Sequence, residues 1–135
     1  MSLTKEIIDK KVNFEFNKEF INVFSKKIKD NDTEFLNRTL KEQHPADSAD
    51  LIENLIPENR SKLIELEGFN LNPEIFIELN ESIQMEIFIL LSTESIVNIL
   101  KRSESDNALK ILENLDEKKK NTVLDKLPPK DRFIL

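Results

Sequence analysis

The sequence predicts an all-α protein, a right-handed superhelix (solenoid) of short helices. The 135 residues include only 1 Gly and 5 Pro, while Leu, Ile, Glu and Lys are abundant, and this composition favours helix over sheet. Apolar residues recur at helical spacing almost throughout the chain, whereas strict alternation is confined to Val12, Phe14 and Phe16. Helix-start signals return every 8 to 16 residues from His44 onward. Helices of two or three turns are not stable alone in water, so these helices are expected to stack on one another.

The first long helix is predicted from Phe residues that recur every four positions from 16 to 24 and are continued by Ile28. We expect this stripe to pack in the core, although a partner-binding stripe would have the same spacing. The helix should end at Asp30-Asn31-Asp32, where Asp32 can cap a second helix containing Phe35, Leu36 and Leu40. Residues 1–27 are interpreted as a frayed leader, up to about Asn13, and an N-terminal helix packing on a superhelical domain of residues 28–135.

The later helices are predicted from their start signals. Asn, Ser and Asp side chains accept hydrogen bonds from first-turn amides, and Pro suits the first helical position because its missing N–H has no partner there. A short amphipathic block follows each start, and the block Met85–Leu91 is apolar nearly all round, so its helix is expected to lie deepest. The predicted starts are His44-Pro45, Ile56-Pro57, Asn72-Pro73, Asn80, Ser92, Ser103, Asp116 and Leu127-Pro128.

Composition excludes most catalytic and nucleotide-binding classes. The chain has no Cys, a single His and a single Gly, so it lacks thiolate sites, sites with two imidazoles and Gly-rich phosphate loops. No base beside a nucleophile can be named, and we expect neither an enzyme nor a catalytic site. No apolar run approaches the ~20 residues that span a bilayer, and the N-terminus lacks the order of a signal peptide.

The net charge of −6 does not favour nucleic acid as a partner. The negative charge is concentrated in the middle of the chain. Residues 41–100 carry 12 acidic but only 3 basic side chains, a net charge of −9. Such a segment repels another acidic surface within a Debye length of about 8 Å, and divalent cations between the two reverse that repulsion.

Three local groups of residues can each be interpreted either as a functional site or as an ordinary feature of a folded helix. Asp47, Asp50 and Glu53 share a helix face that suits a hard cation, but a helix-start acid on a solvated face is the favoured interpretation. His44 is expected to be a cap or packing residue rather than a lone ligand. The run Lys118–Lys120 is expected to be a solvated helix face rather than a phosphate or headgroup site.

One string is more specific than these patterns. The sequence His44-Pro45-Ala46-Asp47-Ser48-Ala49-Asp50-Leu51 follows a turn and leucine pattern at 29–40 and precedes the repeats Ile56-Pro57-Glu58-Asn59-Arg60 and Leu127-Pro128-Pro129-Lys130-Asp131-Arg132. Over about residues 28–132 the chain thus resembles the N-terminal cytoplasmic domain of MgtE magnesium transporters. Members of that family continue into a pair of CBS domains and a membrane pore, so the chain is interpreted as an excised domain or a short relative.

The resemblance implies a regulatory domain that docks on the CBS domains of its own chain when cytosolic Mg²⁺ is high. It implies weakly bound Mg²⁺ as the cofactor, a transporter homodimer, and a place at the cytoplasmic face of the bacterial inner membrane without insertion of this segment. The family's acidic positions facing the CBS domains fall on Glu74 and Asp106. A third acidic position falls on Lys110, which puts the corresponding ion in doubt.

Other interpretations remain open at this point. Glu74 and Asp106 suit equally well the role of helix-start acids that interact with the helix macrodipole. The repeats also resemble those of flagellar motor-switch proteins of the FliG type, although no organised row of charges is visible. A general helical-repeat module for protein interaction is the third alternative.

Overall fold

The computed structural model describes residues 14–128, and every regular element in that range is helical. The all-α prediction is confirmed for this part of the chain, which contains nine α-helices, one short 3₁₀ helix and no strand. The leader up to Asn13 and any helix following Leu127-Pro128 lie outside the described residues. The elements are α2 (Phe14–Lys29), α3 (Thr33–Glu42), α4 (Pro45–Glu53), α5 (Pro57–Glu67), η1 (Gly68–Asn70), α6 (Pro73–Glu78), α7 (Glu81–Leu90), α8 (Thr93–Arg102), α9 (Ser105–Glu113) and α10 (Glu117–Lys126).

The turn between α2 and α3 has the predicted chemistry. Asn31 adopts φ 57°, a left-handed conformation that Asn tolerates better than most residues. Asp32 then caps α3, because its Oδ1 accepts a hydrogen bond of 3.1 Å from the amide of Phe35. Phe24 and Ile28 are fully buried, which confirms the core interpretation for this part of the Phe stripe. Helix α2 extends across the predicted domain boundary at 27/28, and that boundary stays a prediction.

Most of the predicted helix starts are confirmed by side-chain caps, and one is wrong by a residue. Ser103 was expected to begin α9, but its hydroxyl donates back to the Ile99 carbonyl at 2.6 Å and ends α8 instead. Glu104 is the N-cap of α9 and makes no side-chain cap bond. The confirmed side-chain caps after α3 are His44, Asn72, Asn80, Ser92 and Asp116.

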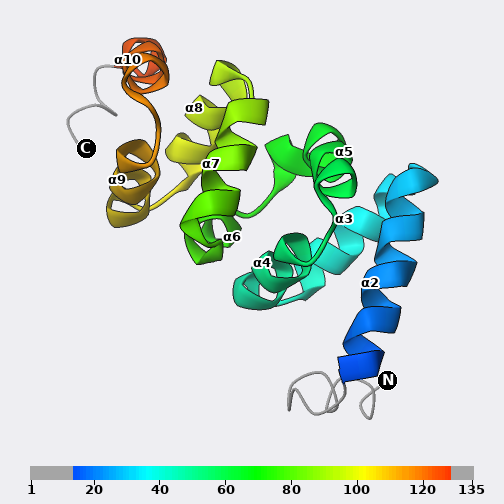
Figure 1. The fold of residues 1–135 in the computed structure, drawn as a ribbon. Helices are drawn as coiled ribbons and strands as arrows, with labels where there is room; N and C mark the ends of the chain where they lie inside the picture. The colour runs from blue at the N-terminus through cyan, green and yellow to red at the C-terminus, as the bar shows by residue number, and fades with distance from the viewer. Residues whose placement is uncertain (1–13, 129–135) are drawn as a thin grey trace.

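The helices follow one another across the molecule from α2 at one end to α10 at the other (Figure 1). Several helices pack on helices that are not their neighbours in the sequence: α4 packs on α6, α6 on α9, α5 on α7, and α8 on α10. A continuous cluster of buried apolar side chains runs through these contacts. Phe76 of α6 and Phe88 of α7 lie within it, with ring centroids 5.7 Å apart.

The prediction that the Met85–Leu91 helix lies deepest is wrong. Within α7, Ile87 and Phe88 are buried, but Met85 is 50% exposed, Ile89 72% and Leu90 47%. Neighbouring helices cover only one side of α7, so its remaining apolar residues face solvent. A helix that is apolar all round lacks the polar stripe that would mark its outer side, and the sequence therefore overestimates its burial.

A buried arginine fixes the path from α4 to α5 and on to α7. The Arg60 side chain is only 5% exposed. Its Nη1 donates to the Leu55 carbonyl at 2.8 Å and to the Ile52 carbonyl at 3.2 Å, and the Ile52 carbonyl also accepts the amide of Leu55 at 3.2 Å. Its Nε and Nη2 bind the two carboxylate oxygens of Glu86 at 2.6 and 3.1 Å. The Arg60 side chain thus connects α4, α5 and α7.

Two further side chains of this kind join helices that are distant in sequence. Gln84 of α7 donates to the Phe76 carbonyl of α6 at 2.5 Å and accepts a hydrogen bond from the Asn114 amide at the end of α9. Lys119 of α10 donates to the Leu91 carbonyl at 2.7 Å, at the end of α7. Gln84 therefore fixes α6 relative to α9, the two helices that carry the predicted acidic site residues.

Candidate functional site

Glu74 and Asp106 occupy equivalent places on two helices. Each is the second residue of its helix, Glu74 in α6 and Asp106 in α9, and each side chain is exposed. The amide of Glu74 donates to the cap residue Asn72 at 2.9 Å, which fixes the helix start. Within residues 14–128, neither carboxylate has a hydrogen-bond or ion-pair partner. Both acids are therefore open to an external ligand.

The fold brings the two helix starts onto neighbouring helices without forming a complete metal site. Helices α6 and α9 pack on each other and are linked through Gln84. No group of three or more His, Asp or Glu side chains that could hold a metal ion occurs among the described residues. Any ion held at Glu74 or Asp106 would take its other ligands from water or from a partner.

Lys110 lies one helical turn after Asp106, in the last turn of α9, and is exposed. A primary ammonium is a hydrogen-bond donor with no lone pair when charged, so it cannot serve as a metal ligand. Its charge reduces the negative potential around Asp106. This part of the site is thus less acidic than the surroundings of Glu74.

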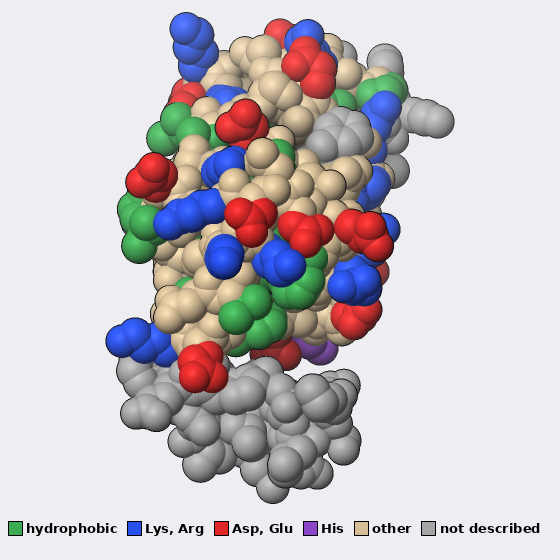
Figure 2. All heavy atoms as spheres, turned by 90° about the vertical axis from the view of Figure 1, so that its right-hand side faces the viewer, with side chains coloured by type: hydrophobic (Ala, Val, Ile, Leu, Met, Phe, Trp, Pro, Cys, Tyr) green, Lys and Arg blue, Asp and Glu red, His purple; other side chains and the backbone are tan. Residues whose placement is uncertain are grey.

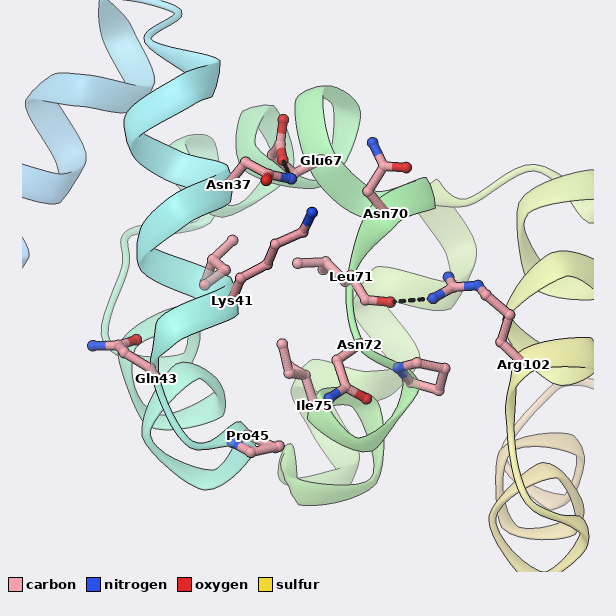
Figure 3. A pocket seen from close by; sticks show the side chains of 12 residues that line it. Asn37, Lys41, Gln43, Pro45, Glu67, Asn70, Leu71, Asn72, Ile75 and Arg102 are labelled. Carbon is pink, nitrogen blue, oxygen red and sulfur yellow. Dashed lines mark hydrogen bonds between the residues drawn. The ribbon is translucent and has the colours of Figure 1, made fainter.

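A cavity of about 400 Å³ lies near these helix starts, lined by residues of α3, α4, α5, η1, α6 and α8 and of the segments that join them. Figure 3 shows the Lys41 side chain extending from α3 into it. Arg102 is anchored at the opposite side by donating to the Leu71 carbonyl at 3.0 Å, and partial burial lowers the pKa of Arg102. The carboxylate of Glu67, which is buried, accepts a hydrogen bond of 3.0 Å from Asn37.

This cavity borders the candidate site. Its wall includes Asn72 and Pro73, which directly precede Glu74, and Arg102, four residues before Asp106. None of the described lining residues carries a hydroxyl, thiol or imidazole group, and the one carboxylate among them, that of Glu67, accepts the hydrogen bond from Asn37. The lining residues are Asn37, Leu40, Lys41, Gln43, Pro45, Glu67, Asn70, Leu71, Asn72, Pro73, Ile75 and Arg102.

The remaining acidic candidates follow the ordinary interpretation. Asp47 lies in the first turn of α4 and is exposed, as is Asp50. Glu53 is occupied, because its Oε2 accepts the backbone amide of Asn80 at 2.6 Å and so joins α4 to the start of α7. His44 is a cap: its Nδ1 accepts the Ala46 amide at 3.2 Å.

The Lys118–Lys120 run is only partly the solvated face that the sequence predicted. Lys118 is exposed, but Lys119 is half-buried and binds the end of α7 as described above. Figure 2 shows another surface, on the side of the molecule where α2 lies, on which acidic and basic side chains interleave. No extended basic patch is formed on the described part of that face.

The sequence and the fold are both similar to those of known proteins. Residues 43–135 match the family described as the MgtE intracellular N domain. A solved structure described as the "Crystal structure of the soluble part of a magnesium transporter" aligns with a TM-score of 0.72 at 16% identity, over 87% of this chain and 47% of that one. The chain thus spans about half the length of that structure, and at this identity the likeness shows a shared fold. No curated protein matches the sequence.

Proposed function

The chain belongs to the family of MgtE intracellular N domains, and we propose that it is the Mg²⁺-sensing regulatory domain of a magnesium transporter. The family is one of transporter domains rather than enzymes, in agreement with the sequence-based expectation. The observation that carries the proposal is the pair Glu74 and Asp106: two exposed carboxylates without partners at the starts of neighbouring helices.

The proposed mechanism is Mg²⁺-dependent docking on the CBS domains of the same full-length chain. Residues 41–100 carry a net charge of −9, and this segment repels an acidic surface of a partner when Mg²⁺ is low. Mg²⁺ keeps several waters and is usually held by one or two carboxylates, so each shared site is weak. Dissociation constants near millimolar, about 4 kcal/mol per site, suit an ion that is sensed at millimolar concentration.

Docking controls the transporter only if Mg²⁺ binds the docked arrangement better than the undocked one, because differential affinity alone shifts a conformational equilibrium. Glu74 and Asp106 supply that difference, since each completes a site only when the partner surface is close. Two sites, each with a coupling of about 1–3 kcal/mol, shift the populations substantially. Lys110 weakens the site near Asp106, so Glu74 carries the larger share.

We also infer how the domain is arranged around this site. The packing of α4 on α6 and of α6 on α9 supports a superhelix, for which we infer the right-handed sense predicted from the sequence, and α2 packs on α3 and α5. The proposed setting is a transporter homodimer at the cytoplasmic face of the bacterial inner membrane. No helix within residues 14–128 is long and apolar enough to cross a membrane.

The test is association of this chain with the CBS-domain pair of its transporter, followed by sedimentation velocity across a Mg²⁺ titration. We expect a complex at high Mg²⁺ that dissociates on chelation, and weaker association for Glu74→Gln with Asp106→Asn. The matched control is Glu34→Gln with Glu117→Gln, which removes the same charge from two other exposed first-turn acids. Association that is independent of Mg²⁺, or equal weakening by both pairs, would overturn the proposal.

A further inference from the structure

One side chain, that of Arg102, joins the two segments that lead into the helices of the candidate site. Arg102 is the last residue of α8, and its Nη1 donates to the Leu71 carbonyl at 3.0 Å, as Figure 3 shows. Its Nε donates to Oδ1 of Asn98, one turn back in α8, at 2.8 Å, which orients the guanidinium. Leu71 lies three residues before Glu74, and Arg102 lies four residues before Asp106. The Arg102 bridge therefore connects the start of α6 to the start of α9.

The path from Leu71 to Glu74 is held by further hydrogen bonds. The next residue, Asn72, caps α6, because its Oδ1 accepts the Glu74 amide at 2.9 Å and its carbonyl accepts the Ile75 amide at 2.9 Å. The 3₁₀ helix η1, which precedes Leu71, packs on α8. A shift of the Leu71 carbonyl would therefore move the start of α6, and Glu74 with it.

The path from Arg102 to Asp106 is equally short. Only Ser103 and Glu104 separate α8 from α9. The amide and the hydroxyl of Ser103 donate to carbonyls in the last turn of α8, at 3.1 and 2.6 Å. The Glu104 carbonyl accepts the Ala108 amide at 2.9 Å, which closes the first turn of α9. Asp106 thus follows the end of α8 closely.

We propose that Arg102 is a positioning residue that sets the separation of Glu74 and Asp106, so that both acids meet their partner ligands in the same docked arrangement. Arg102 acts through the proposed Mg²⁺-dependent docking, on which this role rests. Mg²⁺ demands near-ideal octahedral geometry, so a displaced acid holds a shared ion less well. A guanidinium suits this role, because its planar fork binds Asn98 and Leu71 in fixed directions.

The charge of Arg102 by itself would act in the opposite sense. A cation close to two carboxylates lowers the negative potential that attracts Mg²⁺, so removal of the cation alone should favour ion binding. Positioning and charge therefore predict opposite changes when Met replaces Arg102.

The test measures the Mg²⁺ midpoint for protease protection of the segment that joins this domain to the CBS domains in the full-length transporter. We expect Arg102→Met to raise the midpoint at least about fivefold. Asn98→Ala keeps the charge of Arg102 but removes the group that orients it, and it should raise the midpoint by a smaller factor. The matched control is Lys119→Met, which removes a cation that donates to the Leu91 carbonyl at 2.7 Å, between α10 and α7, and should leave the midpoint unchanged.

A double-mutant cycle separates positioning from a general loss of stability. In the Glu74→Gln background a single acid remains, so its separation from a second acid no longer matters, and Arg102→Met should no longer raise the midpoint. Thermal unfolding of each variant checks that the fold is retained. If Arg102→Met does not fold, an unchanged midpoint in Asn98→Ala overturns the proposal.

Other outcomes would also overturn it. A lower midpoint in Arg102→Met would mean that Arg102 acts through its charge alone. An equal rise in the Glu74→Gln background, or in Lys119→Met, would mean that its role is only structural. An unchanged midpoint in Arg102→Met, with a parent whose protection depends on Mg²⁺, would overturn the positioning role and leave the proposed docking intact. Protection that is independent of Mg²⁺ in the parent would overturn the proposed docking, and the positioning role with it.

Discussion

Replacing Arg60 by Met should destabilise the domain strongly, because it removes a buried cation that satisfies several groups at once. The substitution keeps most of the apolar stem, but it leaves the Leu55 carbonyl without its Arg60 donor, removes one of the donors to the Ile52 carbonyl, and leaves Glu86 without its counter-ion. Breaking a buried pair by removal of one partner costs about 3–5 kcal/mol. The Glu86 side chain is 35% exposed and regains water, which reduces the expected loss to about 2–4 kcal/mol.

Urea unfolding followed by circular dichroism measures this loss, and the matched variant is Glu86→Gln. In that variant Arg60 keeps its bonds to the carbonyls of Ile52 and Leu55 and can donate to the new amide oxygen, but its buried charge loses its counter-ion, so we expect a cost of about 1–3 kcal/mol. For a chain of this length, a loss of about 3 kcal/mol corresponds to a fall in Tm of roughly 10 °C. The reasoning is refuted if Arg60→Met costs less than about 1 kcal/mol, or if Glu86→Gln leaves the free energy of unfolding unchanged.

Three further outcomes are expected. Phe88→Ala should cost about 3–5 kcal/mol in urea unfolding, because Phe88 is 2% exposed and packs on Phe76; a loss below about 1 kcal/mol would contradict this packing. The hydrogen bond from the Phe35 amide, and to a smaller extent the Lys27 ammonium, lowers the pKa of Asp32. The Asp32 carboxylate therefore stabilises the fold above a pH of about 4, and this stabilisation is lost as the pH falls through the lowered pKa. Asp32→Asn should therefore lower the Tm near neutral pH and make the acid-side fall of the Tm shallower than in the parent, and equally steep falls would exclude this role. The isolated chain should gain only about 0.4 kcal/mol from Mg²⁺ near its dissociation constant, and a Tm rise of about ten degrees would reveal a complete site.

The helix starts were predictable because capping is local. Asp32, Asn80 and Asp116 accept bonds from amides three residues ahead, so the residue type and its position in the sequence carry the signal. Ser103 shows the limit of that signal. A serine hydroxyl can cap the following helix or bond back to the preceding one, and the choice made at Ser103 depends on the packing of α8.

Features that join distant segments were not predictable in the same way. Arg60 stood in a recognisable repeat, yet nothing in the sequence links it to Glu86 in another helix. Gln84 and Lys119 looked like ordinary helix residues, and their roles depend on carbonyl groups that only the folded chain brings close. The exposure of Ile89 likewise depends on which neighbours cover α7, because hydrophobicity alone does not distinguish a buried apolar face from an exposed one.

The candidate site was predictable from the sequence only in part. The cap at Asn72 predicted that Glu74 begins a helix, and the family resemblance pointed to Glu74 and Asp106 together. The packing of α6 on α9 and the Gln84 bridge are properties of the fold, and they place both acids on one pair of neighbouring helices.

The most direct test of the proposed Mg²⁺-dependent docking is protease protection of the segment that joins this domain to the CBS domains in the full-length transporter, followed across a Mg²⁺ titration. We expect Glu74→Gln with Asp106→Asn to move the protection midpoint to higher Mg²⁺, and Lys110→Asp to move it to lower Mg²⁺ by adding a ligand. The pair Glu34→Gln with Glu117→Gln should leave the midpoint in place. An unchanged midpoint in the Glu74→Gln, Asp106→Asn variant would contradict the account and leave the two acids as ordinary helix-start residues.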